Sequence, residues 1–267
     1  GDDVIPVEIT GVKSGKLSRG HRFLRPALVE EAKAVESLDD AKELLEKADL
    51  IIYAGSLVNP GLLAYAKPEC VIMDSASMTL EEVIAAMVPA AQEGKLVVRL
   101  HTGDPSVYGA HREQIDLLRS YGLDFEIVPG VSSFCAAAAA LDAEYTLPNV
   151  SQSVIITRME GRTPVPSRQK IADYAAHGAT MVIFLSSGML EKLQTELIKG
   201  GYTADTPAAI VYKASWPDEK VVRCTVGTIA ASAAEHNITK TALITVGGFL
   251  GHEYERSELY NPTYTHM

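Results

Sequence analysis

The sequence predicts an α/β protein of two domains, each with a largely parallel or mixed β-sheet flanked by helices. From about residue 50, short runs of β-branched and aliphatic residues alternate with longer segments of helical period, which is typical of α/β units. The chain of 267 residues is long enough for two such domains. Proline and glycine interrupt the pattern near residues 129–133. We therefore divide the chain into an atypical N-terminal segment, an N-terminal α/β domain and a C-terminal α/β domain, at residues 1–36, 37–130 and 131–267.

The strands are predicted from their short aliphatic runs, and the helices from their capping residues. Ser37 with Asp40, and Thr79 with Glu82, match the S/T-x-x-D/E pattern that begins a helix. The helix expected at 79–93 has its apolar residues on one side, which indicates packing on a core rather than cofactor binding. The predicted strands are residues 50–54, 70–73, 96–101, 125–128, 153–158, 180–185, 208–213, 220–226 and 242–246.

Composition excludes several classes of partner. The 34 acidic and 24 basic residues give a net charge of −10, which argues against nucleic-acid binding because phosphate contacts need clustered Lys and Arg. No apolar run approaches the roughly 18 residues that a membrane span needs, so we expect no membrane partner. The three cysteines are far apart, and no apolar export signal is visible at the N-terminus, so we expect reduced thiols and a cytoplasmic protein.

Three loops that follow predicted strands carry candidate ligand-binding residues, because open α/β sheets bind ligands beyond the carboxyl ends of their strands. Residues 102–109 contain glycines and Asp104, which can accept a hydrogen bond from an amine or hydroxyl. Residues 129–133 open a helix and offer two hydroxyls. Residues 213–219 contain the only Trp of the chain. Each loop could instead be an ordinary turn, and their common position after strands favours function.

Arginines and histidines give weaker signals. Arg158 and Arg162 follow a strand in a proline-rich loop, where they could clamp carboxylates or lie on a solvated surface. The histidines lack metal-ligand spacing, so we expect no metal held by side chains. Neither the GxGxxG dinucleotide motif nor the GxxxxGK[ST] phosphate loop occurs.

From about residue 48 to residue 266 the chain resembles the tetrapyrrole methyltransferases of cobalamin biosynthesis. The shared elements are Gly-Asp-Pro at 103–105 and Val-Pro-Gly at 128–130. Two further elements, Thr-Arg-x-x-Gly-Arg-Thr-Pro at 157–164 and Tyr-Lys-Ala-x-Trp-Pro-Asp-Glu at 212–219, resemble those of the C-11 methyltransferases of this family. The resemblance implies transfer of a methyl group from S-adenosylmethionine to ring carbon 11 of precorrin-4 or cobalt-precorrin-4, with S-adenosylhomocysteine as product.

The resemblance also implies two α/β domains that form a trough, a homodimer, and a set of contact residues. The catalytic residues stay unknown, and we name no nucleophile because the sulfonium methyl group is already activated. The acidic protein must hold a polyanionic tetrapyrrole, so local cations are expected to bind it. The implied cofactor contacts are Thr102, Gly103, Asp104, Val107, Ser132, Ser133, Ser186, Ala214 and, more weakly, Ala242. The implied substrate contacts are Tyr108, Arg112, Arg158, Arg162 and Lys213.

The N-terminal segment departs from the family. The family has a first strand followed by Gly-x-Gly-Pro-Gly-Asp, whereas the corresponding residues 28–35 here favour helix and lack glycine. Residues 4–9 are the candidate for a first strand followed by a different loop. If residues before 37 do not replace the glycine loop, their deletion should change cofactor affinity little.

This departure leaves three hypotheses open. The chain is an active C-11 methyltransferase, a cofactor-impaired relative that binds tetrapyrrole or serves as a structural subunit, or a related S-adenosylmethionine enzyme with another substrate.

Overall fold

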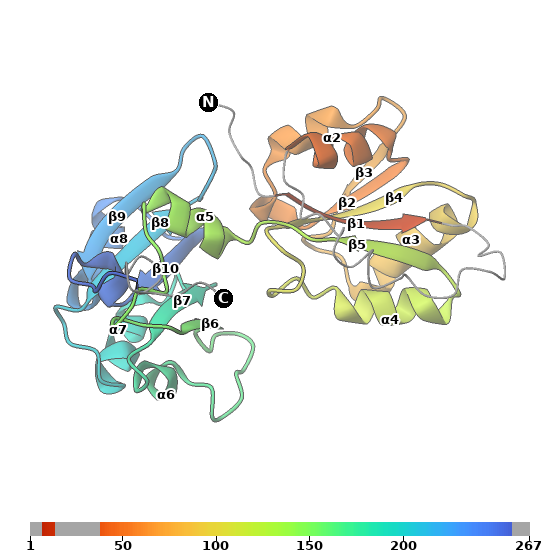
Figure 1. Cartoon of the computed structure of the whole chain (residues 1–267). Coiled ribbons are helices and arrows are strands. Elements are labelled where there is room, and N and C mark those ends of the chain that lie inside the picture. The colour runs from red at the N-terminus through yellow and green to blue at the C-terminus, as the bar shows by residue number, and fades with distance from the viewer. Residues whose placement is uncertain (1–6, 14–37, 258–267) are drawn as a thin grey trace, which may run out of the picture. The chain divides into compact units, whose positions relative to one another are not determined.

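The computed structural model describes residues 7–13 and 38–257. The chain divides into two compact units, Gly1–Ser133 and Phe134–Met267, and each unit contains one five-stranded sheet (Figure 1). The expected α/β class is confirmed. None of the helices in the described ranges is long and apolar enough to span a membrane.

The sheet of the first unit has the strand order β3-β2-β4-β1-β5. Strand β2 is parallel to β3 and β4, whereas β1 is antiparallel to both of its neighbours, β4 and β5. The carboxyl ends of β2, β3, β4 and β5 therefore lie at one edge, together with the amino end of β1. The strands are β1 (Val7–Lys13), β2 (Leu50–Tyr53), β3 (Val71–Asp74), β4 (Val97–Thr102) and β5 (Asp124–Val128).

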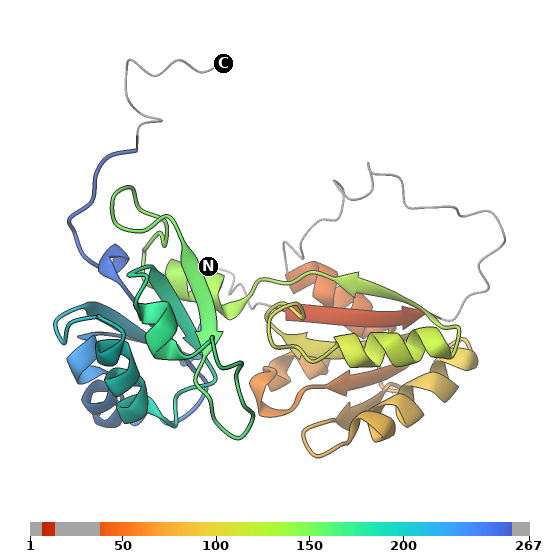
Figure 2. The same ribbon diagram turned by 90° about the horizontal axis from the view of Figure 1, so that it is seen from below.

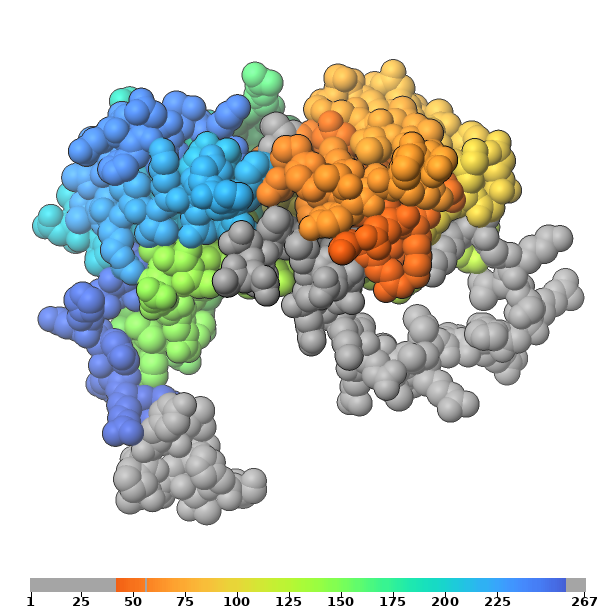
Figure 3. Space-filling model, turned by 90° about the horizontal axis from the view of Figure 1, so that it is seen from above, coloured from red at the N-terminus to blue at the C-terminus, as the bar shows by residue number. Residues whose placement is uncertain are grey.

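Helices cover both faces of this sheet (Figures 1 and 2). One apolar cluster joins α2 and η2 to the sheet through Leu45 and Leu62, and these two segments are neighbours on the surface (Figure 3). A second cluster joins α3 and α4 to the other face through Met87 and Leu118. The helical segments are α2 (Leu38–Lys47), η1 (Gly55–Leu57), η2 (Pro60–Tyr65), α3 (Leu80–Gln92) and α4 (Arg112–Ser120), where η denotes a 3-10 helix.

Helix α3 begins with the capping box that the sequence predicts. The Thr79 hydroxyl accepts a hydrogen bond from the Glu82 amide at 3.2 Å, and the Glu82 carboxylate accepts one from the Thr79 amide at 2.7 Å. Each side chain thus pairs with a backbone donor that the helix leaves unpaired. The other predicted cap, Ser37, lies outside the described residues.

The sheet of the second unit has the order β6-β7-β10-β8-β9. Only the β6–β7 pair is parallel, and the other three pairs are antiparallel. The carboxyl ends of β6, β7 and β8 nevertheless lie at one edge, next to the amino ends of β9 and β10. The strands are β6 (Val154–Arg158), β7 (Thr180–Phe184), β8 (Pro207–Tyr212), β9 (Lys220–Thr225) and β10 (Ala242–Val246).

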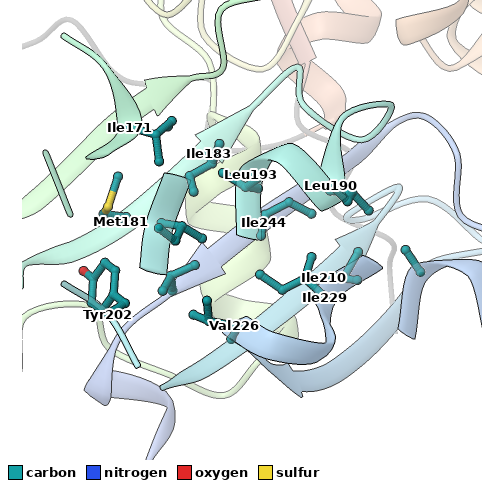
Figure 4. Packing of buried hydrophobic residues seen from close by; sticks show 14 of the residues in the cluster. Ile171, Met181, Ile183, Leu190, Leu193, Tyr202, Ile210, Val226, Ile229 and Ile244 are labelled. Atoms are coloured by element: carbon teal, nitrogen blue, oxygen red, sulfur yellow. The ribbon is translucent and has the colours of Figure 1, made fainter. Parts of the chain in front are cut away.

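The core of the second unit also has two sides. Ile183, Leu193 and Ile244 pack together in the cluster beneath α6, α7 and α8 (Figure 4). Ala137 of α5 and Phe249 of η4 pack on the opposite face. The helical segments are α5 (Ser133–Ala140), α6 (Ile171–Ala175), α7 (Leu190–Lys199), η3 (Val226–Thr228), α8 (Ile229–Glu235) and η4 (Gly248–Leu250).

The first strand lies slightly later in the N-terminal segment than expected. A strand does occur near the candidate residues 4–9, but it is described from Val7 to Lys13. It runs antiparallel, with Val7 opposite Thr102 and Lys13 opposite Asp124. A loop that follows this strand therefore starts at the edge opposite the candidate ligand-binding loops. Residues 28–35, where the family's glycine loop was expected, lie outside the described residues.

We predict that deletion of residues 1–36 prevents cooperative folding of the first unit. The deletion removes β1 from between β4 and β5 and leaves β5 without its partner. Domain stabilities are only about 5–15 kcal/mol, so loss of the pairing of two strands should exceed them. Urea unfolding followed by circular dichroism measures this, with deletion of residues 1–6 as the control that keeps β1. A truncated protein with wild-type unfolding would contradict the placement of β1 and restore the expectation that the segment is dispensable.

Candidate functional site

In the first unit, Asp104 joins the loop after β4 to the loop after β5. Its Oδ2 accepts a hydrogen bond from the Gly130 amide at 3.0 Å, and its Oδ1 accepts one from the Ser106 amide at 3.0 Å. The Ser106 hydroxyl donates to the same Oδ1. Asp104 therefore holds the two loops together, and the remaining lone pairs of its carboxylate can still accept from a ligand.

Two glycines let the backbone of this loop pack tightly. Gly103 has φ +73°, a backbone conformation that favours glycine, and a Cβ there would be in ordinary contact with Ser132 and Ser133 at 3.4 Å. A Cβ on Gly109 would lie 2.3 Å from the carbonyl oxygen of Pro105, a distance that no side chain tolerates. The loop therefore brings main-chain groups of residues 102–104 close to Ser132, which is itself buried.

A buried polar network lies beneath this loop. Arg99 of β4 is only 6% exposed, and its guanidinium donates to Ile52 O at 2.9 Å, to Ser75 Oγ at 2.9 Å and to Gln114 Oε1 at 3.2 Å. Gln114 of α4 is 8% exposed and donates through Nε2 to Ala110 O at 3.2 Å. Burial lowers the pKa of Arg99 to about 10, against the opposing effect of Asp74. The guanidinium thus stays charged near neutral pH.

His101 lies on the same strand and is 5% exposed. Its Nε2 has no hydrogen-bond partner among the described residues, and its ring makes an edge contact with His111 at 6.5 Å between centroids. Burial, with smaller contributions from the neighbouring Arg99 and His111 charges, lowers the pKa of His101 from 6.5 to about 3. The imidazole is therefore neutral at physiological pH.

In the second unit, Ser186 has a comparable joining role and is completely buried. Its hydroxyl donates to Phe184 O at 2.7 Å and accepts from the Met159 amide at 3.0 Å. The next residue, Ser187, donates to Ala242 O at 3.2 Å. These bonds connect the loops after β6 and β7 to the amino end of β10.

The loop after β8 is held in an unusual backbone conformation. Lys213 and Ser215, on either side of Ala214, have φ +47° and +66°. The Lys213 amide donates to Thr241 O at 2.9 Å, and the Ser215 amide donates to Glu219 Oε2 at 2.5 Å. These bonds fix the orientation of the Ala214 peptide groups, since left-handed backbone is unfavourable for residues with a Cβ.

The candidate cations differ in how far their charge is already engaged. Lys213 pairs with Asp218 at 2.6 Å, which raises the lysine pKa, and its ammonium lies 4.9 Å from the Trp216 ring centroid. Arg158 donates to Met159 O and Thr163 O, both at 3.2 Å, and to a third carbonyl of its own loop at 2.8 Å.

Arg112 and Arg162 are more accessible to solvent than Lys213 and Arg158. The Arg112 side chain is 79% exposed and pairs with Asp116 at 3.0 Å, one turn further along α4. Arg162 is exposed and, within the described part of the chain, makes no hydrogen bond or ion pair.

The expected residues thus gather at one sheet edge in each unit. The first edge has a set that includes both cofactor and substrate candidates, namely Thr102, Gly103, Asp104, Val107, Tyr108, Arg112, Ser132 and Ser133. The second edge has Arg158, Arg162, Ser186, Lys213, Ala214 and Ala242. No group of three or more His, Cys, Asp and Glu side chains suited to a metal ion occurs in the described residues.

Sequence reasoning missed the network of Arg99, His101 and Gln114. A signal for the first two was present, because they alternate with apolar residues in an otherwise aliphatic strand and so share the face of Val97. A charged residue in such a strand indicates a buried polar role. Gln114 gave no signal, since its role depends on how α4 is rotated against the sheet.

A comparison with known families assigns the chain to one of them. The family model of tetrapyrrole (corrin/porphyrin) methylases matches residues 40–230. The chain therefore belongs to the tetrapyrrole methylase family.

Individual members of this family are similar to the chain over most of its length. The cobalt-precorrin-4 C(11)-methyltransferase of Methanocaldococcus jannaschii is 56% identical over 226 residues, covering 84% of this chain and 87% of the relative. The precorrin-4 C(11)-methyltransferase of a Sinorhizobium species is 46% identical over 225 residues, covering 84% and 88%. The X-ray structure of a cobalt-precorrin-4 methyltransferase superposes with a TM-score of 0.78 at 47% identity, covering 81% of this chain and 90% of that one.

We predict that His101 makes the first unit less stable in mild acid. Its folded pKa of about 3 lies below the ordinary value of 6.5, so the unfolded chain binds the extra proton and stability falls as the pH drops below 6.5. Urea unfolding at pH 7 and pH 5 should show that the wild type loses about 2 kcal/mol more than His101→Gln, which cannot titrate. Equal losses in the two proteins would show that the imidazole is not held neutral.

Proposed function

We propose that this protein transfers the methyl group of S-adenosylmethionine to ring carbon 11 of precorrin-4 or cobalt-precorrin-4 in cobalamin biosynthesis. The observation that carries the proposal is the 56% identity, over 84% of the chain, to a C(11)-methyltransferase. The cobalt-containing and cobalt-free substrates are both candidates, because relatives named for each are 46–56% identical to this chain.

Polar groups at the edge of the first unit support a cofactor site there. Gly103 adopts φ +73° next to Ser132, and the main-chain groups of this loop and the Asp104 carboxylate are polar partners for an amino acid or ribose group. We propose that Thr102, Gly103, Asp104, Val107, Ser132 and Ser133 of the first unit contact the cofactor, as do Ser186, Ala214 and Ala242 of the second.

Methyl transfer requires mainly that the protein position the two reactants. S-adenosylmethionine supplies a methyl group already activated by its sulfonium, and a reduced tetrapyrrole is an electron-rich carbon nucleophile. The protein therefore needs no covalent nucleophile, and its contribution lies in holding the reactants in line. Asp104 and Ser186 would act by fixing the loops, since each joins two of them.

Local cations would hold the carboxylates of the tetrapyrrole. The net charge of −10 disfavours long-range attraction, so short-range contacts must dominate. Arg162 is the strongest candidate because it is exposed and has no ion-pair partner within the described ranges. We propose lesser contacts for Tyr108, Arg112 and Lys213, and a loop-ordering role for Arg158 in addition to substrate contact.

We also propose that the protein forms a homodimer and is located in the cytoplasm. The thiols of Cys70, Cys135 and Cys224 are free, which supports a reducing compartment. Analytical ultracentrifugation tests the dimer, for which a single species of twice the 28.7 kDa chain mass is expected.

A second candidate is a cofactor-impaired relative that binds the tetrapyrrole without methylating it. The direction of β1 favours this alternative, because the strand ends at the edge opposite the residues 102–104 and a glycine loop after it would start away from them. Calorimetry with S-adenosylhomocysteine, followed by a methylation assay with precorrin-4 and its cobalt complex, separates the two. Binding with turnover supports the methyltransferase, and absence of binding supports the impaired relative.

We predict that Asp104→Ala weakens S-adenosylhomocysteine binding by about 10-fold to 150-fold. A hydrogen bond to a charged group contributes roughly 1.5–3 kcal/mol, and the variant also releases the Gly130 amide. Isothermal titration calorimetry measures the dissociation constant. Ser106→Ala is the matched control, because it removes one hydroxyl from the same loop and keeps the carboxylate. An unchanged dissociation constant in Asp104→Ala would remove this residue from the site.

We predict that Arg162→Ala raises the Michaelis constant for the tetrapyrrole about tenfold and leaves S-adenosylhomocysteine affinity unchanged. A charge-assisted contact to a carboxylate is lost, whereas no cofactor contact is proposed for this side chain. Steady-state kinetics and calorimetry measure the two effects, with the exposed Arg168→Ala as the control for loss of one surface charge. Equal effects of Arg162→Ala on both ligands would refute the assignment.

A further inference from the structure

We propose that Gln114 is a positioning residue for the ligand-binding loop at residues 103–111. Arg99 orients the side-chain amide of Gln114, and this amide holds the end of the loop in place. The proposal rests on the proposed function, in which this loop contacts cofactor and substrate. Neither residue belongs to the motifs that link the chain to its family, and both are buried below the loop.

Arg99 is fixed by acceptors from three separate elements. Its Nη1 donates to Ile52 O of β2, its Nη2 to Ser75 Oγ just after β3, and its Nε to Gln114 Oε1 of α4. Within the described residues no carboxylate lies within ion-pair distance of this buried cation. These neutral acceptors are therefore needed to compensate the charge, and the side chain cannot turn without losing them.

The orientation of the Gln114 amide follows from Arg99. A guanidinium has donors and no acceptor, so the oxygen of the amide must face Arg99 and the nitrogen must point away from it. That nitrogen donates to Ala110 O at 3.2 Å. The loop is thus held by the Gln114 amide nitrogen, whose direction is determined by Arg99 of β4.

The backbone near Ala110 needs a hydrogen bond of this kind to hold its conformation. Tyr108 and Ala110 have φ +58° and +49°, in a left-handed region that residues with a Cβ rarely adopt. Asp104 anchors the beginning of the loop through Gly130, and Gln114 anchors its end. The substrate candidate Tyr108 lies between the two anchors, so its position depends on both.

Gln114→Glu separates the positioning role from general stability. At pH 8 the carboxylate still accepts from Arg99, while its second oxygen replaces the donor and faces the Ala110 carbonyl. We expect an unfolding temperature equal to or above that of the wild type, faster amide hydrogen exchange across residues 103–111, and about a fivefold or greater increase in the dissociation constant of S-adenosylhomocysteine or the Michaelis constant of the tetrapyrrole.

Two further variants guard against a purely structural explanation. Gln114→Met removes both polar contacts at similar volume, and Thr79→Ala removes the cap of α3 in the same unit without touching the loop. Both variants should lower the unfolding temperature. Only Gln114→Met should raise the dissociation constant of S-adenosylhomocysteine or the Michaelis constant of the tetrapyrrole, when these are measured well below the unfolding temperature. If Gln114→Glu fails to fold, this comparison decides the question.

The outcomes distinguish this proposal from the proposed function. Wild-type exchange rates and ligand constants in a folded Gln114→Glu would overturn the positioning role, as would equal ligand effects in Gln114→Met and Thr79→Ala. If the wild type binds no S-adenosylhomocysteine, the proposed function fails instead. The hydrogen-exchange comparison then still tests whether Gln114 orders the loop.

Discussion

The buried guanidinium of Arg99 is the interaction on which the ligand-binding edge of the first unit depends. It takes its acceptors from β2, from the end of β3 and from α4, so one charge holds together elements that are far apart in sequence. An arginine without a carboxylate partner is costly to bury unless its donors are satisfied. The edge is therefore constrained to a single arrangement, on which the loops with Asp104 and Gly103 are built.

The second unit reaches a similar result with neutral groups. The buried Ser186 hydroxyl links the loops after β6 and β7, and one backbone hydrogen bond from Lys213 to Thr241 links the loop after β8 to the residue before β10. Because a hydroxyl both donates and accepts, it can join two backbone segments without burying a charge. Both units thus place their candidate residues on loops that hydrogen bonds tie to neighbouring segments.

The strand positions could be predicted from sequence because short aliphatic runs between turns specify them, as at residues 242–246, where prediction and structure coincide. Strand direction could not, because the side-chain period is the same in parallel and antiparallel sheets. The mostly antiparallel second sheet and the reversed β1 therefore came only from the structure. At the site, loop positions followed from strand ends, whereas the partners of Asp104 and Arg158 depend on tertiary contacts that no local pattern encodes.

The measurement that tests the central claim most directly is the position of the transferred methyl group. The full chain is incubated with precorrin-4, or its cobalt complex, and with S-adenosylmethionine whose methyl carbon is carbon-13, and the product is examined by NMR. The account predicts one labelled methyl group per tetrapyrrole, bonded to ring carbon 11. Label at another carbon, or no label in a protein that binds S-adenosylhomocysteine, would contradict it.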